Sequence, residues 1–528
     1  MDIYKLRNGF VSSVTRQENR MSEGVFKGSD FALKCRNVAN STTNAPVRII
    51  GILLLSASLL SLTILSYSVL TPTVHTSSPK RIVLTSFNTF IGQYDNRTYY
   101  ANDLINGTNY AVDPDCASTL INSAIYWANA HNGGGTVQIG SGLFLLSETI
   151  IPKSNVYLQV SPSATIFENT PANLDTSISL VLCSNVQNFT LDGGTWDANK
   201  GRLSDHRDTG TWHKNFDKYL GIAFYGGSNN GITVKNIVLK NVIGHGIDFM
   251  SVVNGTIYNC IVINSGDNPI TVESTAPSFK SNTTVRNCYV RGGQDVGINT
   301  WIVSNVTIQG CTVTNVTQHR DGSHWGIAAE YSKDIAIIDN HVSGCDYNIV
   351  STSDNVLIAN NTVDGAYSTG ANFGIMIATA RDNIVCNNTI KNVIQTLGTY
   401  RNTETFNTQF INNICGVGST TTDGGYTWIA GANTTITGGV MYSTNINGCI
   451  ILVSANNTRI IGVTFLGTNG LTDYGTRSYN VHSAYNNFLG LTGTDVSLPN
   501  SSNVTHAYNI GYPDAMDQSF VREFRGKR

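Results

Sequence analysis

One short pattern recurs along the middle of the chain and decides its fold. The clear copies are TVKNIVL from Thr233, TIYNCIV from Thr256, TVRNCYV from Thr284, TIQGCTV from Thr307, AIIDNHV from Ala336, LIANNTV from Leu357, IVCNNTI from Ile384 and QFINNIC from Gln409. Weaker copies are TLDGGTW from Thr190, TITGGVM from Thr435 and RIIGVTF from Arg459. Most copies begin about 25 residues apart, which is the length of one turn of a solenoid built from short strands.

The middle of each copy predicts a bend. The second and seventh places are mostly apolar, and because they differ by an odd number, both point inward only if the strand bends between them. The fifth places at this bend are Ile237, Cys260, Cys288, Cys311, Asn340, Asn361, Asn388 and Asn413. Stacked asparagine amides can hydrogen-bond from coil to coil, and the cysteines are better explained by buried stacking than by zinc binding.

Composition excludes several classes of protein. The 528 residues carry a formal charge of −2, and only 13% of them are charged. This balance argues against nucleic acid as a partner, and the 41% apolar content supplies a large core rather than a disordered chain. Nine of the ten cysteines follow residue 48, an odd number that prevents complete pairing within one chain. Thirteen Asn-x-Ser/Thr motifs in the same part permit glycosylation without indicating it.

A membrane anchor is expected near the N-terminus. Residues Ile49 to Leu70 form a mainly apolar run of 22 residues without charge, long enough to cross a bilayer of about 30 Å. Residues 1–48 carry eight basic and four acidic side chains, so they are expected in the cytoplasm with the bulk of the chain outside, on a cell or a virion envelope. A cleaved signal peptide is the competing interpretation, but the apolar run and its basic flank are long for one.

The repeats resemble the right-handed parallel β-helix of the pectate-lyase and polygalacturonase superfamily. The run from Asp115 to Ile166, DCASTLINSAIYWANAHNGGGTVQIGSGLFLLSETIIPKSNVYLQVSPSATI, looks like the helical cap and first two coils of that family, and LDGGTWDANKG from Leu191 looks like one of its usual coils. The cap helix would bury Leu120, Ala124, Ile125 and Ala128 over the open end of the strand stack.

The resemblance implies an all-β, single right-handed β-helix of about a dozen coils with an N-terminal capping helix. The apolar run predicts one transmembrane helix ahead of it. The expected organisation is a cytoplasmic tail (1–48), a signal-anchor helix (49–70), a linker (71–95), the β-helix (96–480) and a C-terminal cap or tail (481–528). The superfamily includes lyases, hydrolases, epimerases and attachment proteins, so the fold alone does not decide the function.

Candidate site residues follow a second recurring strand. This strand has an isoleucine near its start in successive coils, at Ile247, Ile270, Ile298, Ile327 and Ile349. The residues three places before these isoleucines are, in the same order, Gly244, Asp267, Asp295, His324 and Asp346. Neighbouring coils lie about 4.8 Å apart, so Asp267, Asp295 and His324 are expected in one column. Close carboxylates can act as acid and base, or Asp267 and Asp295 can bind Ca²⁺. Because two neighbouring carboxylates repel each other, replacing both aspartates with asparagine is expected to leave the stability of the protein unchanged or to improve it.

Other residues are expected to flank this column. His245 and Asp248 are further catalytic candidates, and the candidates for substrate binding are Glu273, Arg291, Arg320, Glu330, Trp212 and Tyr219. Trp212 and Tyr219 belong to a charge-dense insertion, residues 201–220, whose rings could stack on sugars. A solvated surface loop and ordinary corner aspartates are the alternative interpretation.

The glycosidase motifs of the resembled family match only in part. GHGID has His245 where that family has aspartate, SGDNPI keeps Asp267 but has Asn268 for the second aspartate, and Val296 stands in place of its histidine. Two functional hypotheses therefore stay open. One is a surface-anchored polysaccharide lyase or glycoside hydrolase, and the other is a non-catalytic attachment or structural protein that binds a cell-surface glycan. The sequence leaves the oligomeric state open.

Overall fold

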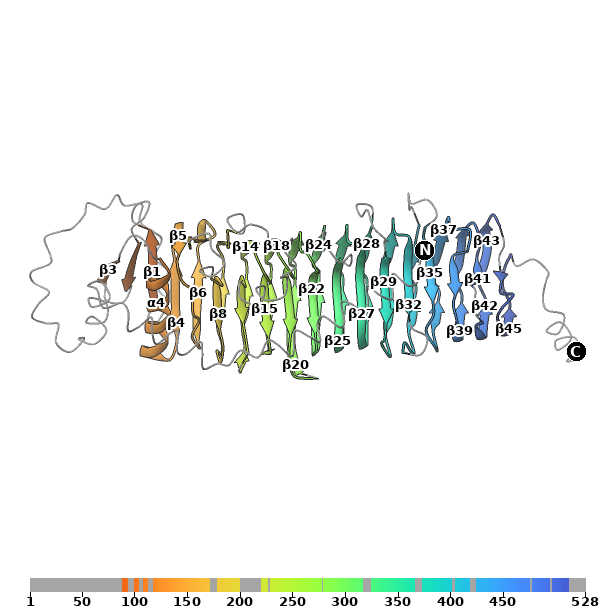
Figure 1. Ribbon diagram of the computed structural model, residues 1–528, viewed down its shortest axis with the longest axis horizontal. Helices are drawn as coiled ribbons and strands as arrows, with labels where there is room; N and C mark the ends of the chain where they lie inside the picture. The colour runs from red at the N-terminus through yellow and green to blue at the C-terminus, as the bar shows by residue number, and fades with distance from the viewer. Residues whose placement is uncertain are drawn as a thin grey trace, which may run out of the picture.

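The computed structural model describes a long rod of stacked strands (Figure 1). The described residues are 88–93, 99–103, 108–112, 117–170, 178–199, 220–226, 228–277, 279–316, 324–365, 373–400, 404–417, 424–474, 477–493 and 496–511. The expected membrane helix, residues 49–70, lies outside them. Within the described ranges, no helix combines the length and apolar character needed to span a bilayer.

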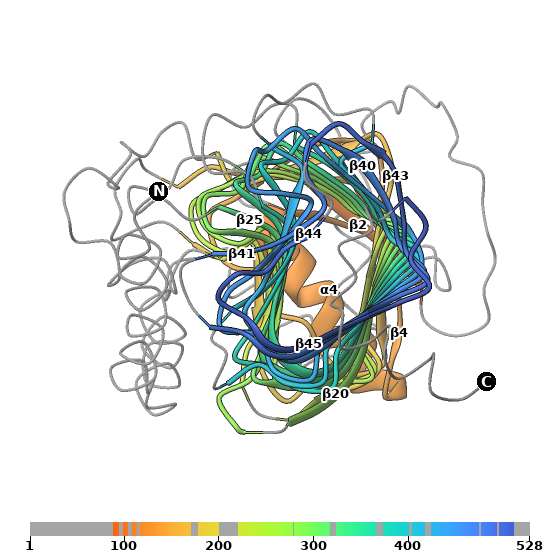
Figure 2. The ribbon, with the colours of Figure 1, turned by 90° about the vertical axis from the view of Figure 1, so that its right-hand side faces the viewer.

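The rod is a right-handed parallel β-helix of about 13 turns. Each full turn contributes strands to three stacks, and the view along the axis in Figure 2 shows how the stacks enclose a common interior. The prediction of an all-β solenoid of about a dozen coils is confirmed.

The first stack is parallel throughout and carries the recurring isoleucines. Its strands are β8 (Val181–Cys183), β11 (Ile222–Phe224), β15 (Ile247–Met250), β19 (Ile270–Glu273), β22 (Val296–Trp301), β25 (Trp325–Ile338), β27 (Tyr347–Ala359), β29 (Phe373–Ala378), β32 (Gln395–Tyr400), β35 (Tyr426–Ile429), β38 (Ile450–Leu452), β41 (Leu471–Asp473) and β44 (Val496–Ser497). The long strands β25 and β27 run on from the first stack into the second.

The second stack contains the first half of each sequence repeat. Its strands, besides the ends of β25 and β27, are β4 (Gly135–Ile139), β6 (Val156–Val160), β9 (Thr190–Asp192), β13 (Thr233–Lys235), β17 (Thr256–Tyr258), β20 (Phe279–Arg286), β23 (Val303–Gln309), β30 (Ile384–Cys386), β33 (Gln409–Ile411), β36 (Thr435–Thr437), β39 (Asn456–Ile461), β42 (Tyr479–Ala484) and β45 (Ser502–Ala507).

The third stack contains the second half of each repeat and forms a separate 14-stranded sheet. Its strands are β5 (Gly142–Leu146), β7 (Ala164–Glu168), β10 (Thr195–Asp197), β14 (Val238–Val242), β18 (Ile261–Ser265), β21 (Tyr289–Arg291), β24 (Thr312–Thr314), β26 (His341–Ser343), β28 (Thr362–Asp364), β31 (Thr389–Lys391), β34 (Ile414–Cys415), β37 (Val440–Ser443), β40 (Thr464–Gly467) and β43 (Asn487–Leu491). The short strands β12 (Asn229–Asn230) and β16 (Val252–Val253) pair separately.

The sequence repeats are in register in the structure. Thr233 pairs with Thr256, Thr256 with Thr284, and the alignment continues coil by coil to Arg459. The isoleucines of the first stack are also aligned, because Ile270 pairs with Ile247 on one side and Ile298 on the other. The aligned isoleucines are buried, so the apolar period sets the register of the coils.

The bend between the second and third stacks holds a buried ladder of amides. Asn340 Nδ2 donates to Asn361 Oδ1 (3.0 Å), Asn361 Nδ2 to Asn388 Oδ1 (2.9 Å), and Asn388 Nδ2 to Asn413 Oδ1 (3.0 Å). This confirms the expected internal ladder. Cys260, Cys288 and Cys311 hold the same place in earlier coils, where they are buried and free of disulfides.

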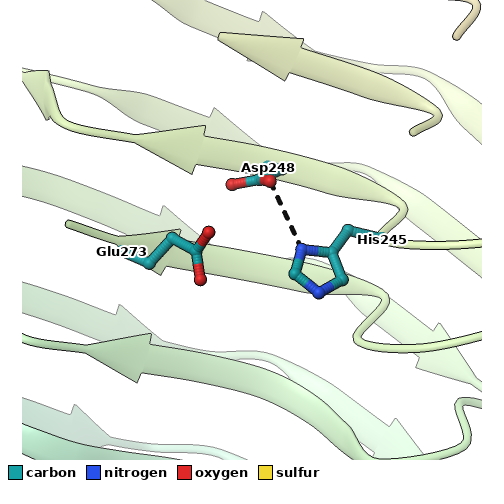
Figure 3. A group of neighbouring side chains, drawn as sticks. All are labelled: His245, Asp248 and Glu273. Atoms are coloured by element: carbon teal, nitrogen blue, oxygen red, sulfur yellow. Dashed lines mark hydrogen bonds and ion pairs between the residues drawn. The ribbon is translucent and has the colours of Figure 1, made fainter. Parts of the chain in front are cut away.

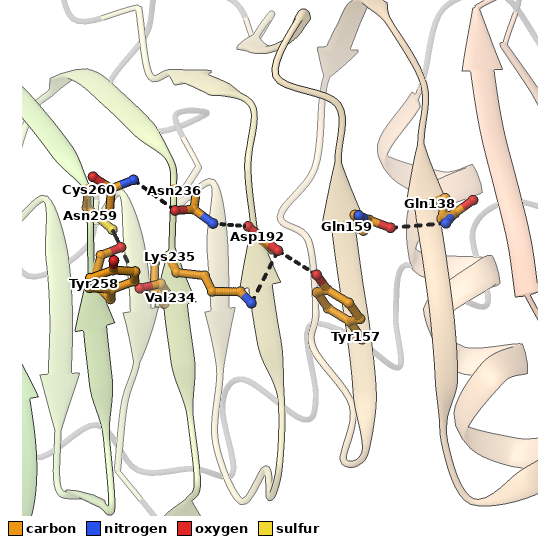
Figure 4. Close-up of polar contacts among 10 residues, drawn as sticks. All are labelled: Gln138, Tyr157, Gln159, Asp192, Val234, Lys235, Asn236, Tyr258, Asn259 and Cys260. Carbon is orange, nitrogen blue, oxygen red and sulfur yellow. Dashed lines mark hydrogen bonds and ion pairs between the residues drawn. The ribbon is translucent and has the colours of Figure 1, made fainter. Parts of the chain in front are cut away.

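Polar ladders also follow the outer surface of the second stack (Figure 4). Gln138 donates to Gln159 (3.0 Å), while Asp192 accepts from Tyr157 and from Asn236 and lies 3.4 Å from the ammonium of Lys235. Because equivalent positions recur at one strand spacing, side chains that hydrogen-bond to their own kind link neighbouring coils.

The N-terminal end is capped as expected. The helix α4 (Ala117–Asn132) buries Leu120, Ala124, Ile125 and Ala128 and lies across the end of the coils (Figure 2). Ahead of it, β1 (Asn88–Gln93) pairs in parallel with β4, and β2 (Tyr99–Asp103) and β3 (Thr108–Val112) follow as antiparallel neighbours. Described strands therefore extend beyond the expected limits of the β-helix, from residue 88 to Ala507 in β45.

Candidate functional site

A histidine between two aspartates lies on the outer side of the first stack. His245 precedes β15, Asp248 lies on β15, and Asp267 precedes β19 in the next coil. Nδ1 of His245 is 3.3 Å from Asp248 Oδ2, and Nε2 is 3.2 Å from Asp267 Oδ2. All three side chains are buried. Ile247 and Phe249 point into the core, so Asp248 between them points outward, which explains how a carboxylate is accommodated here.

The charge balance of this cluster favours a protonated histidine. Burial by itself lowers the pKa of His245, but the charge of Asp267 and the hydrogen bonds with Asp248 and Asp267 outweigh burial and raise the pKa well above its ordinary value. The imidazolium then compensates the negative charge of carboxylates that would otherwise repel each other.

Glu273 completes a group of three potential ligand-bearing side chains. The ligand atoms of His245, Asp248 and Glu273 all lie within 4.8 Å of one another, and Figure 3 shows the two carboxylates and the imidazole facing a common space. One imidazole nitrogen with carboxylate oxygens suits Zn²⁺ better than Ca²⁺, which prefers oxygen ligands alone. Binding of a metal to His245 would require loss of its proton.

A second column on the same face combines carboxylates with a tryptophan. Glu273 pairs in register with Trp301, and Trp301 with Glu330, so the indole lies between two acidic side chains of neighbouring coils. Glu330 Oε2 accepts a hydrogen bond from Asn299 Nδ2 at 2.9 Å. Glu273 and Glu330 therefore occupy equivalent positions two coils apart, and all of these side chains are less than one-tenth exposed.

Three buried polar atoms on this face lack a hydrogen-bond partner in the part of the chain that the structure describes. They are Thr271 Oγ1, Asn299 Oδ1 and Trp301 Nε1. Thr271 and Asn299 are register partners on β19 and β22. A buried polar group without a partner costs about 1–3 kcal/mol, and these three atoms lie on the neighbouring strands β19 and β22 of one face.

The expected column of Asp267, Asp295 and His324 separates into different pairings. Asp267 approaches His245 of the preceding coil, whereas His324 Nδ1 lies 2.7 Å from Asp346 Oδ2 of the following coil. The backbone carbonyl of Asp295 accepts from Trp325 N (3.0 Å), which places Asp295 at the same corner. Ca²⁺ binding by Asp267 and Asp295 stays a prediction.

An aromatic ladder beside this corner was not anticipated from the sequence. Val296, Trp325, Tyr347 and Phe373 are register partners in successive coils. The rings of Tyr347 and Phe373 stack with centroids 4.6 Å apart, and Trp325 and Tyr400 meet this pair edge-on. Val296 and Trp325 form a small apolar cluster with Ala328, Val350 and Met376, separate from the core, and Tyr347 and Tyr400 pack against it. The available signal was an aromatic residue two places before Ile327, Ile349 and Ile375.

The remaining candidates lie elsewhere. Arg291 is exposed on β21 in the third stack, so it does not share the outer face of the first stack. Arg320, Trp212 and Tyr219 lie outside the described residues, as do Ile49 and Leu70. We call the side of the first stack that carries His245, Asp248, Glu273, Trp301, Glu330 and the aromatic ladder the acidic-aromatic face.

Comparison with known proteins identifies the fold. Residues 220–372 match the family model described as "Right handed beta helix region". No curated protein sequence matches the chain. Among solved structures, the surface adhesin PfbA of Streptococcus pneumoniae is similar at 16% identity, over 71% of this chain and 88% of its own, with a TM-score of 0.41.

Two further structures belong to proteins with other activities. The A-module of the mannuronan C-5 epimerase AlgE6 of Azotobacter vinelandii is 15% identical over 75% of this chain and 95% of its own, with a TM-score of 0.39. A tailspike protein of the E. coli bacteriophage HK620, solved with a pentasaccharide, is 13% identical over 79% of this chain and 80% of its own, with a TM-score of 0.45. Similarity at this level assigns none of these activities to the chain. With the match to residues 220–372, the aligned strands identify the protein as a right-handed parallel β-helix.

Proposed function

We propose that the protein binds polysaccharide through the acidic-aromatic face. The observation that carries this proposal is that two kinds of side chain follow each other along one sheet. Carboxylates and amides lie on β15, β19 and β22, and the rings of Trp325, Tyr347 and Phe373 follow on β25, β27 and β29. Aromatic faces stack on the apolar side of sugar rings, while carboxylates and amides accept and donate to hydroxyls. A row of equivalent positions repeated along the rod suits a chain of repeating units.

The aromatic ladder is partly exposed, which supports a role in contact with a ligand. Tyr347 is partly exposed, and Tyr400 is likewise accessible in part at the far end of the ladder. Burial and the neighbouring carboxylate of Asp346 raise the pKa of Tyr347 to about 12, so its hydroxyl stays protonated and able to donate.

We propose that the protein binds the polysaccharide without catalysing a reaction on it. A general base needs a free lone pair, yet both ring nitrogens of His245 face carboxylates and the raised pKa keeps the imidazole charged. The alternative is a polysaccharide lyase or glycoside hydrolase, for which the carboxylates of Asp248, Asp267 and Glu273 would be the reacting groups.

The test is a glycan array followed by affinity measurements on the best ligand. Tyr347→Ala removes the central ring of the ladder and is expected to weaken binding by about 1–3 kcal/mol, since stacking partners typically contribute this much. Tyr442→Ala is the matched control, because Tyr442 is a partly exposed tyrosine on β37 in the third stack. If the parent and Tyr347→Ala bind the glycan equally well, the acidic-aromatic face is not the binding site. Release of reducing ends or unsaturated products by the parent would favour the enzyme.

We further propose that residues 49–70 anchor the protein in a membrane with the β-helix outside. The uncharged 22-residue run and the excess of basic residues before it support this placement. An outward β-helix would bring the acidic-aromatic face into contact with glycans outside the membrane.

A further inference from the structure

A second polar groove lies near the C-terminal end of the rod, on the outer surface of the second stack. It has a volume of about 840 Å³ and spans the strands β36, β39, β42 and β45. These strands belong to a different stack from the acidic-aromatic face and to later coils. The volume is in the range of sites that hold small ligands or a few sugar units.

One side of the groove is an outward column that carries positive charge. Thr435 pairs in register with Arg459, Arg459 with His482, and His482 with Thr505. Nδ1 of His482 lies 2.7 Å from Thr505 Oγ1, which orients the imidazole. The guanidinium of Arg459 is exposed. None of the ten described residues that line the groove is acidic.

The other side of the groove is a ladder of exposed amides. Asn457 Nδ2 donates to Asn433 Oδ1 (3.0 Å), Asn480 Nδ2 donates to Asn457 Oδ1 (2.8 Å), and Asn503 Nδ2 donates to Asn480 Oδ1. Each primary amide has two N–H groups, and one link of the ladder uses one of them. The second N–H of each exposed amide can therefore donate to a ligand, at intervals of about 4.8 Å along the rod.

We propose that this groove binds a carboxylated oligosaccharide. Arg459 supplies a guanidinium, whose planar fork is suited to a carboxylate, and His482 and the amides supply further donors for hydroxyls and ring substituents. The apolar lining is limited to Ile461 and Val481, which makes the groove a poor site for an apolar ligand or peptide side chain. The repeat of donors along the axis matches a chain of similar hydroxyl-bearing units better than a single small anion.

The groove is separate from the polysaccharide site of the proposed function. That site is acidic and aromatic, and carboxylates there would repel a uronate, whereas the groove is lined by donors and positive charge. The protein would then contact glycans at two places on different sides of the rod, with opposite preferences for charge.

The experiment measures binding of an oligogalacturonate to the full-length protein prepared without N-glycans. Arg459→Gln is expected to weaken binding about tenfold or more, because a charge-assisted pair is lost. Asn457→Asp places a negative charge in the centre of the groove, keeps a residue type that tolerates its positive φ of 55°, and is expected to abolish binding. Arg286→Gln is the matched control, because Arg286 is an exposed arginine on β20 of the same stack, outside the groove.

Four further measurements separate the possible explanations: a neutral oligomer, added salt, Tyr347→Ala and competition by inorganic phosphate. A neutral galactose oligomer of equal length is expected to bind at least tenfold more weakly, and added salt is expected to weaken binding of the uronate. Tyr347→Ala is expected to leave oligogalacturonate binding unchanged, so failure of the proposed function and failure of this inference give different results. Unchanged binding by Arg459→Gln, equal binding of the neutral oligomer, or full competition by inorganic phosphate at the same concentration would each overturn the inference.

Discussion

His245 Nε2 and Asp267 Oδ2, from neighbouring coils of the first stack, lie 3.2 Å apart, and both side chains are almost fully buried. The other ring nitrogen of His245 faces Asp248 at 3.3 Å. The site is therefore a buried ion triad, in which the imidazolium holds two coils together and offsets the repulsion of two carboxylates. Its stability and pH dependence follow from this arrangement.

Removal of the cation is expected to destabilise the protein. In His245→Gln two buried carboxylates lose their compensating charge, and breaking a buried pair typically costs about 3–5 kcal/mol. Urea unfolding monitored by circular dichroism measures the loss. The triple variant His245→Gln, Asp248→Asn, Asp267→Asn serves as the control and is expected to recover most of it, because neither carboxylate of the triad is left without its compensating charge. If the triple variant is as unstable as His245→Gln, the charges are not the cause.

Neutralisation of Asp267 alone is expected to lower stability. Repulsion between like charges would predict no loss, but the carboxylate of Asp267 faces the imidazole of His245 at 3.2 Å. Asp267→Asn should therefore reduce the melting temperature, and Asp295→Asn should reduce it less, because Asp295 is not part of this triad. The same thermal melts would contradict the triad if Asp267→Asn were as stable as the parent.

Stability is expected to depend on pH through His245. Its pKa is raised on folding, so its stabilising contribution is fully present below the unfolded pKa of about 6.5 and is lost as the pH rises through the higher folded value. The free energy of unfolding of the parent should fall towards alkaline pH relative to the triple variant. Urea titrations from about pH 6 to pH 10 check this sign. A parent curve parallel to that of the triple variant would mean that His245 does not bind its proton more tightly in the folded state.

The internal amide ladder is expected to be sensitive at its centre. Asn388 Oδ1 accepts from Asn361 N (2.8 Å), and Asn388 Nδ2 donates to Ile358 O (2.9 Å) as well as to Asn413. Asn388→Leu leaves several buried groups without partners and should cost at least about 2–3 kcal/mol. Thr389→Ala, on the outward side of β31, is expected to change stability by less than about 0.5 kcal/mol. Equal effects of the two substitutions would argue against the ladder.

Protease protection tests the proposed orientation. Protease added to intact cells or virions should degrade the chain after about residue 75 and spare a tagged N-terminal tail, because the positive charge before the apolar run favours a cytoplasmic tail. Permeabilised samples are the control, in which the tail should also be digested. Protection of the C-terminal part in intact samples would refute the orientation.

The sequence by itself determined the fold and its register. Apolar residues at fixed places can be buried together only if every coil repeats the same bend, so the alignment of Thr233, Thr256 and Thr284 and the ladder through Asn361 and Asn388 follow from the repeat. The cap helix was predictable in the same way, because its apolar stripe is stable only when it is buried against another apolar surface, here the end of the coils.

The tertiary structure alone decided how the outer face is built. The period places Asp267, Asp295 and His324 at one corner, but it does not specify side-chain direction, and Asp267 pairs with His245 while His324 pairs with Asp346. The aromatic ladder and the groove at Arg459 likewise depend on neighbours that are distant in sequence. Burial of an apolar face constrains the inward positions strongly, whereas the outward side chains choose partners only after the coils are stacked.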